Sequence, residues 1–145
     1  MPTLKPVDAA LAAGIVYKAK DSAEAVIKEA KAVPGLKDNF DFDSITKFNS
    51  KTGAFFKSKS GFGFTVKGCG GKYGNDILVG IRGTASIADG LTDGNIGLQV
   101  SSTGKIVHAG FNRAVKDIET HLAEAIPSGS TVHFCGHSLG GALAT

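Results

Sequence analysis

The spacing of hydrophobic and polar positions divides the chain into two unlike parts. Over residues 6–33, alanine and other apolar residues recur at the spacing of two amphipathic helices, which Pro34 and Gly35 bring to an end. From residue 45 onward, β-branched and aromatic residues come in short runs separated by glycine, serine and lysine. Such runs are typical of strands joined by tight turns. We therefore expect amino-terminal helices over residues 6–33 and a sheet over residues 45–145 of the same domain.

The sheet region begins with antiparallel strands and continues as alternating strands and helices. The β-rich runs come first: SITKFNS, GAFFKSK and GFTVKG, with GCGGKYGND as a hairpin loop. The continuous apolar run DILVGIRG then predicts a strand buried on both faces. NIGLQVS and KIVHAG predict a further hairpin, FNRAVKDIETHLAEAI a helix, STVHFCG a buried strand and SLGGALA the start of a helix. This order predicts an α/β fold with a mixed sheet and covering helices.

Composition and charge narrow the class of protein. The net charge is +3, from 16 basic and 13 acidic residues that are interleaved, so the sequence predicts no nucleic-acid surface. The two cysteines, Cys69 and Cys135, predict no disulfide framework. The apolar run over residues 9–17 follows a lysine, as in a signal peptide, but Asp8 interrupts its approach and no convincing cleavage site follows. We therefore expect a cytoplasmic protein or one exported by a non-classical route.

The stretch GHSLG, residues 136–140, carries the candidate chemistry. It fits G-x-S-x-G, the pattern of a strand-to-helix turn that projects a nucleophilic serine, here Ser138, above a sheet. The run TVHF before it has strand character, and the glycines after the serine let the next helix pack closely. A glycine-rich turn with an incidental serine is the alternative interpretation.

A zinc site is a second interpretation of the same stretch. His133, Cys135 and His137 alternate along the expected strand and would share one face, where nitrogen and sulfur ligands suit zinc. However, no fourth ligand is evident in the sequence, and neither glycine-rich nucleotide-binding signature is present. We therefore predict no metal and no cofactor.

Three separated stretches resemble the class 3 lipase family of α/β-hydrolases. They are IRGTASIADGLTD (residues 81–93), VHAGF (residues 107–111) and GHSLGGALA (residues 136–144), in the family's order and spacing. The resemblance covers residues 77–145 well and the first 76 residues only loosely. It implies an α/β-hydrolase fold and a lipase or phospholipase that acts on lipid esters or small esters.

The resemblance also implies roles for individual residues. Ser138 would attack the ester carbonyl and form an acyl-enzyme. The backbone N–H groups of Thr84 and Leu139 would bind the oxyanion, whose charge appears only in the transition state. Arg82 and Asp93 would pair beneath the oxyanion loop as structural residues.

Two further motif positions bear on the expected enzymology. His108 occupies the histidine of the family's V-H-x-G-F motif, a scaffold position and not the catalytic base. Gly90 stands where the family commonly has tryptophan, in the region where a lid over the active site begins. Because only Ile87 and Leu91 are large and apolar there, we do not expect strong interfacial activation.

The catalytic base and its acidic partner are not evident in the sequence. In the family the acid and then the histidine follow the nucleophile, whereas seven residues follow Ser138 here. We therefore expect the catalytic Asp and His beyond Thr145. Residues 1–145 would then form the N-terminal half of the hydrolase fold, truncated after the serine turn and inactive alone.

Such a half-fold would leave an apolar sheet edge uncovered. We expect the missing C-terminal half, a second copy or a partner protein to cover it. By resemblance to bacterial members of the family that are delivered into rival cells, that partner would be an immunity protein. Transient contact with a membrane surface is also expected of a lipid-directed enzyme. The alternative is a non-catalytic, hydrolase-like module that binds a protein partner through its open sheet face.

Overall fold

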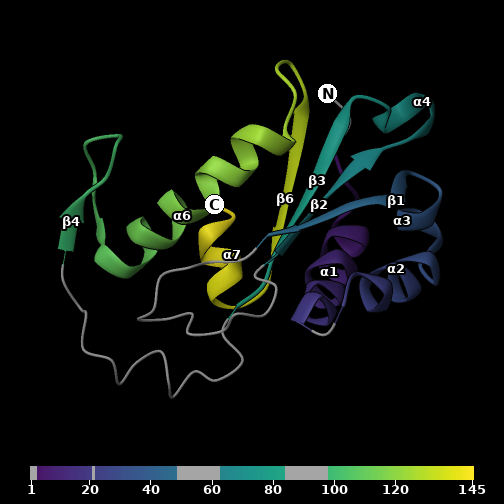
Figure 1. Ribbon diagram of the computed structural model, residues 1–145, viewed down its shortest axis with the longest axis horizontal. Helices are drawn as coiled ribbons and strands as arrows, with labels where there is room; N and C mark the ends of the chain where they lie inside the picture. The colour runs from purple at the N-terminus through teal and green to yellow at the C-terminus, as the bar shows by residue number, and fades with distance from the viewer. Residues whose placement is uncertain (1–2, 21, 49–62, 84–97) are drawn as a thin grey trace.

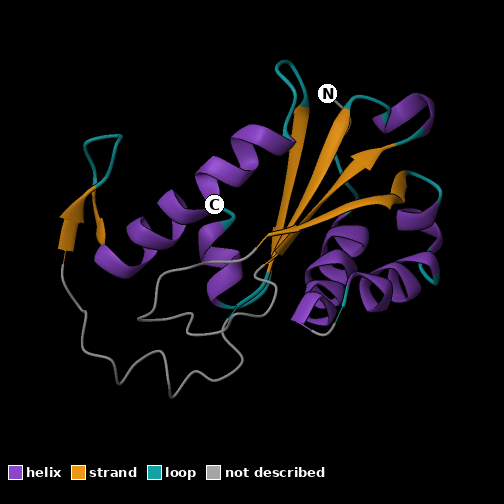
Figure 2. Ribbon diagram, in the orientation of Figure 1, coloured by secondary structure: helices purple, strands orange, loops and turns teal. Residues whose placement is uncertain are grey.

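The computed structural model places a β-sheet between two groups of helices. It describes residues 3–20, 22–48, 63–83 and 98–145. In Figure 1 the sheet runs through the middle of the molecule, with the amino-terminal helices on one side and the helices of the carboxyl-terminal half on the other. Figure 2 separates helices and strands by colour, and the same layers are visible there. This arrangement agrees with the predicted α/β class.

The amino-terminal helices form the first layer. They are α1 (Pro6–Ile15), the 3₁₀ turn η1 (Val16–Lys20), α2 (Ala23–Lys31) and α3 (Pro34–Lys37). Ser22 caps α2, since its side-chain oxygen accepts a hydrogen bond of 3.0 Å from the N–H of Ala25. The helical region predicted over residues 6–33 is therefore confirmed, but Pro34 opens a further helical turn. Proline suits this first position because it has no N–H to satisfy there.

The main sheet has the order β1-β2-β3-β6. Its strands are β1 (Phe40–Phe48), β2 (Gly63–Gly68), β3 (Asp76–Ile81) and β6 (Thr131–Gly136). The pairs β1–β2 and β2–β3 are antiparallel, and β3–β6 is parallel. The sheet is therefore mixed, as predicted. The short helix α4 (Gly70–Tyr73) lies in the hairpin loop between β2 and β3.

The predicted start of the sheet at residue 45 was too late. Strand β1 begins at Phe40, and Phe40 and Phe42 are buried while Asp41 and Asp43 are exposed. This alternation has the period of two that a half-buried strand requires. The strand predicted over residues 53–59 lies outside the described residues.

A hairpin and two helices complete the described chain. Strands β4 (Leu98–Val100) and β5 (Ile106–His108) pair as a separate antiparallel sheet. They lead into α6 (Ala109–Ala125), which begins two residues before the predicted start at residue 111, and α7 (Leu139–Leu143) follows β6. No helix in the described ranges has both the length and the apolar character that crossing a membrane requires.

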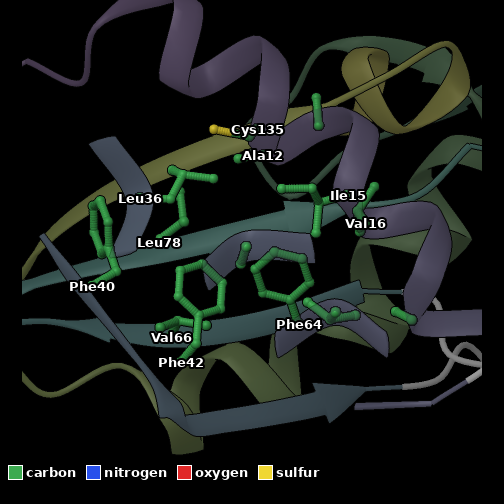
Figure 3. Packing of buried hydrophobic residues seen from close by; sticks show 14 of the residues in the cluster. Ala12, Ile15, Val16, Leu36, Phe40, Phe42, Phe64, Val66, Leu78 and Cys135 are labelled. Atoms are coloured by element: carbon green, nitrogen blue, oxygen red, sulfur yellow. The ribbon is translucent and has the colours of Figure 1, made fainter. Parts of the chain in front are cut away.

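Strand β3 holds the layers together because it contributes to a core on each face. All six of its residues are buried, which confirms the prediction from DILVGIRG. Leu78 packs in the core beneath the amino-terminal helices, where Figure 3 shows it among Leu36, Phe40 and Phe64. The core on the other face lies under α6 and contains Phe48, Ile77, Val79, Ile81 and Ile118. The carboxyl end of β3, which Arg82 and Gly83 follow, is thereby fixed by packing on both faces.

Candidate functional site

Ser138 occupies the sharp turn between β6 and α7. Its backbone angles are φ 57° and ψ −128°, and it is the one non-glycine residue with positive φ in the described part of the chain. This backbone region is sparsely populated and costs about 1–3 kcal/mol, so the surrounding structure must enforce it. The N–H of Gly140 donates to the carbonyl of His137 at 3.0 Å, and that of Gly141 to the carbonyl of Ser138 at 2.9 Å. The turn is closed by these bonds and leaves Ser138 exposed.

Two glycines allow α7 to fold back tightly after this turn. A β-carbon at Gly136 would overlap the carbonyl oxygen of Gly140 and lie 2.6 Å from the nitrogen of Gly141. A β-carbon at Gly140 would overlap the carbonyl oxygen of Ile81 and lie 2.9 Å from the nitrogen of Gly83. Contacts this short would force the backbone apart. The helix is therefore seated directly on the ends of β6 and β3, as the nucleophile turn of G-x-S-x-G requires.

Gly83, just after the end of β3, lies against Ser138. A β-carbon at Gly83 would lie 3.1 Å from the β-carbon of Ser138 and 2.7 Å from the carbonyl oxygen of His137. Leu139 follows the serine as the first residue of α7. Thr84 follows Gly83 in the sequence and lies outside the described residues. Gly83, which precedes Thr84, and Ser138, which precedes Leu139, thus meet at one corner of the sheet.

Comparison with known families agrees with this geometry. The family model described as lipase (class 3) matches residues 78–145. Over these residues the chain is similar to the class 3 lipase family. The match confirms the resemblance drawn from the three motifs and leaves residues 1–77 outside it. No curated protein and no solved structure matches the chain.

The family match gives the coarse class of the protein. The class 3 lipase region runs from β3 to α7 and includes the turn at Ser138. The family has an α/β-hydrolase-like fold, which the mixed sheet with helices on both faces fits. It is a family of lipid ester hydrolases. Several of its predicted motif residues, namely Gly90, Asp93 and the side chain of His108, lie outside the described part of the structure.

One residue beside Ser138 was not indicated by the sequence motifs. Tyr17, in η1, places its hydroxyl 3.0 Å from Nδ1 of His137, and the two rings meet edge to face with centroids 5.7 Å apart. The same hydroxyl would be 3.0 Å from a β-carbon at Gly83. Tyr17 lies at the end of an apolar helical run, where nothing in the local pattern marks a functional residue.

The other described imidazoles lie away from Ser138. His133 shares a hydrogen bond of 2.8 Å with Asp76, in a buried pair that Phe40 and Tyr73 flank edge to face. His133 precedes the last residue of β6 by three residues, or about 10 Å along the strand, and the turn with Ser138 comes after that. His121 is exposed and stacks on the ring of Phe48. His133 thus lies within the sheet, and His121 lies on the surface of α6.

The zinc interpretation is not supported by the structure. His133 is paired with Asp76, Cys135 points into the core, and the His137 imidazole bonds to Tyr17. Each of the three proposed ligands thus has a different neighbour. No cluster of three metal-ligating side chains occurs in the described ranges. The alternation along the strand was read correctly, but His137 lies beyond the end of β6, where the turn redirects it.

Cys135 is buried among apolar side chains, and we expect it to be unreactive in the folded protein. Figure 3 shows its sulfur at the edge of the core beneath α1. Burial raises the pKa of this thiol to about 11. Since the thiolate is the reactive form, a raised pKa lowers reactivity, and roughly one molecule in a thousand would be ionised at pH 8.

Thiol titration tests this expectation. The native chain at pH 8 should release one equivalent of chromophore from a disulfide reagent, through Cys69, and two equivalents after unfolding in urea. A Cys69→Ser variant should release none until it is unfolded. Equal and rapid reaction of both thiols in the native chain would contradict the burial of Cys135.

Proposed function

We propose that this protein hydrolyses carboxylic esters of lipids, as a lipase or phospholipase, through an acyl-enzyme on Ser138. The observation that carries the proposal is the backbone of Ser138, held at φ 57° on a strand-to-helix turn within a class 3 lipase sequence. The Oγ of Ser138 attacks the ester carbonyl, and its proton passes to a general base and then to the departing alcohol. Water attacks the acyl-enzyme in the second half of the reaction and releases the fatty acid.

The oxyanion of each tetrahedral intermediate is assigned to the N–H groups of Leu139 and Thr84. Leu139 is supported by its place directly after the nucleophile, and Thr84 by the packing of Gly83 against Ser138. Charge develops on the carbonyl oxygen in the transition state, where preorganised donors stabilise it more than they stabilise the substrate. Loss of one such donor typically costs about 3–4 kcal/mol of activation free energy.

The general base and its acidic partner are assigned to polypeptide that follows Thr145. This assignment is supported by the partners of the described imidazoles: His133 bonds to Asp76 far from the site, and His137 bonds to Tyr17. It is also supported by the chain order of α/β-hydrolases, in which the acid and the histidine come after the nucleophile.

We propose that the same polypeptide covers the outer edge of β6. In the described sheet β6 is the last strand, and Phe134 on it is 43% exposed. An apolar groove of about 570 Å³ lies beside it, lined by residues of α6, β6 and α7 that include Val115, Leu122 and Leu143. An open strand edge next to an apolar groove favours pairing with another strand. A second copy of the chain, or a partner such as an immunity protein, would be the alternative occupant.

Complementation tests this assignment. Residues 1–145 alone should hydrolyse p-nitrophenyl butyrate no faster than the Ser138→Ala form, and adding the polypeptide encoded after Thr145 should create activity. Phe134→Asp should weaken this complementation, because it places a charge in the groove. Val7→Asp is the matched control, since Val7 is 61% exposed on α1, on the other side of the sheet.

Two outcomes would change the proposal. Activity of residues 1–145 alone that Ser138→Ala abolishes would place the base within these residues. An inactive complemented protein that binds a protein partner through the groove would instead support the second candidate function, a non-catalytic binding module. The exposed Phe134 and the groove beside it are the observations that favour that alternative.

A further inference from the structure

The amino-terminal segment contacts the class 3 lipase site through Tyr17. The Tyr17 ring is half-buried and packs against the core beneath the amino-terminal helices. Its hydroxyl extends to Nδ1 of His137, 3.0 Å away. One end of this side chain is therefore anchored in the core while the other reaches the surface next to Ser138. A tyrosine has few rotatable bonds, so such an anchor holds its hydroxyl in place at little entropic cost.

The Tyr17 hydroxyl meets two backbone segments at once. A β-carbon at Gly83 would lie 3.0 Å from the hydroxyl oxygen, 2.7 Å from the carbonyl oxygen of His137 and 3.1 Å from the β-carbon of Ser138. Gly83 immediately precedes Thr84, and His137 immediately precedes Ser138. Tyr17 therefore lies where the two segments that lead into the site come together.

We propose that Tyr17 is a positioning residue that holds the segment before Ser138 against the end of β3 and so fixes the place of the nucleophile turn and of the Leu139 N–H. The inference rests on the proposed hydrolysis through Ser138. Oxyanion donors stabilise the transition state only when they are held in place before the reaction begins. A displacement of about 1 Å can lower the rate about 100-fold. The hydrogen bond to His137 fixes the serine side of the site, and the position of the hydroxyl beside Gly83 fixes this side relative to the end of β3.

This role assigns part of the active site to residues outside the lipase family match. Tyr17 is separated from His137 by 120 residues, and the family match begins at residue 78. The amino-terminal helices thus do more than cover one face of the sheet. Through Tyr17 they determine how the lipase turn is presented to substrate.

Replacing Tyr17 with phenylalanine tests the proposal in the complete protein, with every residue that its reading frame encodes. Tyr17→Phe keeps the ring in the core and removes the hydroxyl. We expect kcat for p-nitrophenyl butyrate to fall about tenfold and KM to stay within about twofold, because the donors act in the transition state. His137→Leu removes Nδ1 and should lower kcat similarly. The double variant should be no slower than the slower single variant, since both changes break one contact.

The other tyrosine of the chain supplies the matched control. Tyr73 is buried, and its hydroxyl donates to the carbonyl of Thr3 at 3.3 Å. Tyr73 lies in α4, before the start of β3, whereas Ser138 meets the segment that follows the end of β3. Tyr73→Phe likewise removes one hydroxyl that forms a hydrogen bond, so it should lower the urea midpoint of unfolding while kcat stays unchanged. An equal fall in kcat for Tyr73→Phe and Tyr17→Phe would show a general loss of structure and would overturn the positioning role.

The outcomes separate this inference from the proposed function. A wild-type protein that hydrolyses the ester, together with a Tyr17→Phe variant of unchanged kcat, overturns the positioning role alone. A complete wild-type protein without Ser138-dependent hydrolysis overturns both. A selective fall in kcat that His137→Leu does not deepen supports the proposal.

Discussion

Replacing Ser138 with alanine is expected to reduce ester hydrolysis by the complete protein at least about 1,000-fold. The substitution removes the oxygen that attacks the carbonyl, and binding together with the oxyanion donors would account for the remaining rate. Folding should change little, because alanine at this position retains a β-carbon and meets the same strain at φ 57°. The measurement is kcat/KM for p-nitrophenyl butyrate beside the free energy of unfolding in urea.

Two further variants separate the chemistry from the strain. Ser138→Gly also removes the hydroxyl, so it should be as inactive as the alanine variant, but glycine tolerates positive φ and should raise stability by about 1 kcal/mol. Ser102→Ala, in the exposed turn of the β4–β5 hairpin, should leave both activity and stability unchanged. Substantial activity in the alanine variant would refute Ser138 as the nucleophile.

Replacing Gly140 with alanine is expected to cost about 3 kcal/mol of stability, at the upper end of the range for overpacking. The added methyl group would overlap the carbonyl oxygen of Ile81 and lie 2.8 Å from the carbonyl carbon of Arg82. Both neighbours are backbone atoms at the end of a strand that is packed on both faces, so a change of side-chain rotamer cannot relieve the overlap. The helix must instead move away from β3, which would separate Ser138 from Gly83 and lower kcat at least about tenfold.

Gly14 provides the matched control for this substitution. It lies in α1, and a β-carbon there would have no neighbour within 4 Å. Gly14→Ala should therefore be neutral or add up to about 1 kcal/mol, since alanine favours the helix. Urea unfolding followed by circular dichroism, together with the esterase assay, gives both quantities. Equal stability of the Gly140→Ala and wild-type proteins would mean that α7 is not seated on the end of β3.

Much of the fold was predictable because its signals are local. The apolar run DILVGIRG indicated the fully buried strand β3, and GFTVKG coincides with β2. The start of β1 was not predicted, because the alternation of phenylalanine and aspartate in FDFD lies outside the glycine-bounded runs that indicated the other strands. The helix over α6 was predicted from its apolar spacing, with a start two residues too late.

The candidate site was predictable only in part. The serine turn has a signature in consecutive residues, since a strand, a strained serine and small neighbours must follow one another for the backbone to reverse. The alternation of His133 and Cys135 was also evident, but their partners were not. A hydrogen bond such as that between His133 and Asp76 depends on which strand lies beside β6, and residue spacing carries no information about that.

By itself the sequence indicated the similarity to class 3 lipases through three motifs, which the family match over residues 78–145 confirms, and GHSLG marked the serine turn. Tertiary structure decided what surrounds that turn. Pairing of β3 with β6 brought Gly83 against Ser138, and packing of the amino-terminal helices brought Tyr17 to His137, across 120 residues of chain. The physical reason is that backbone conformation follows from neighbouring residues, whereas contacts between distant residues exist only after the layers of the fold have packed together.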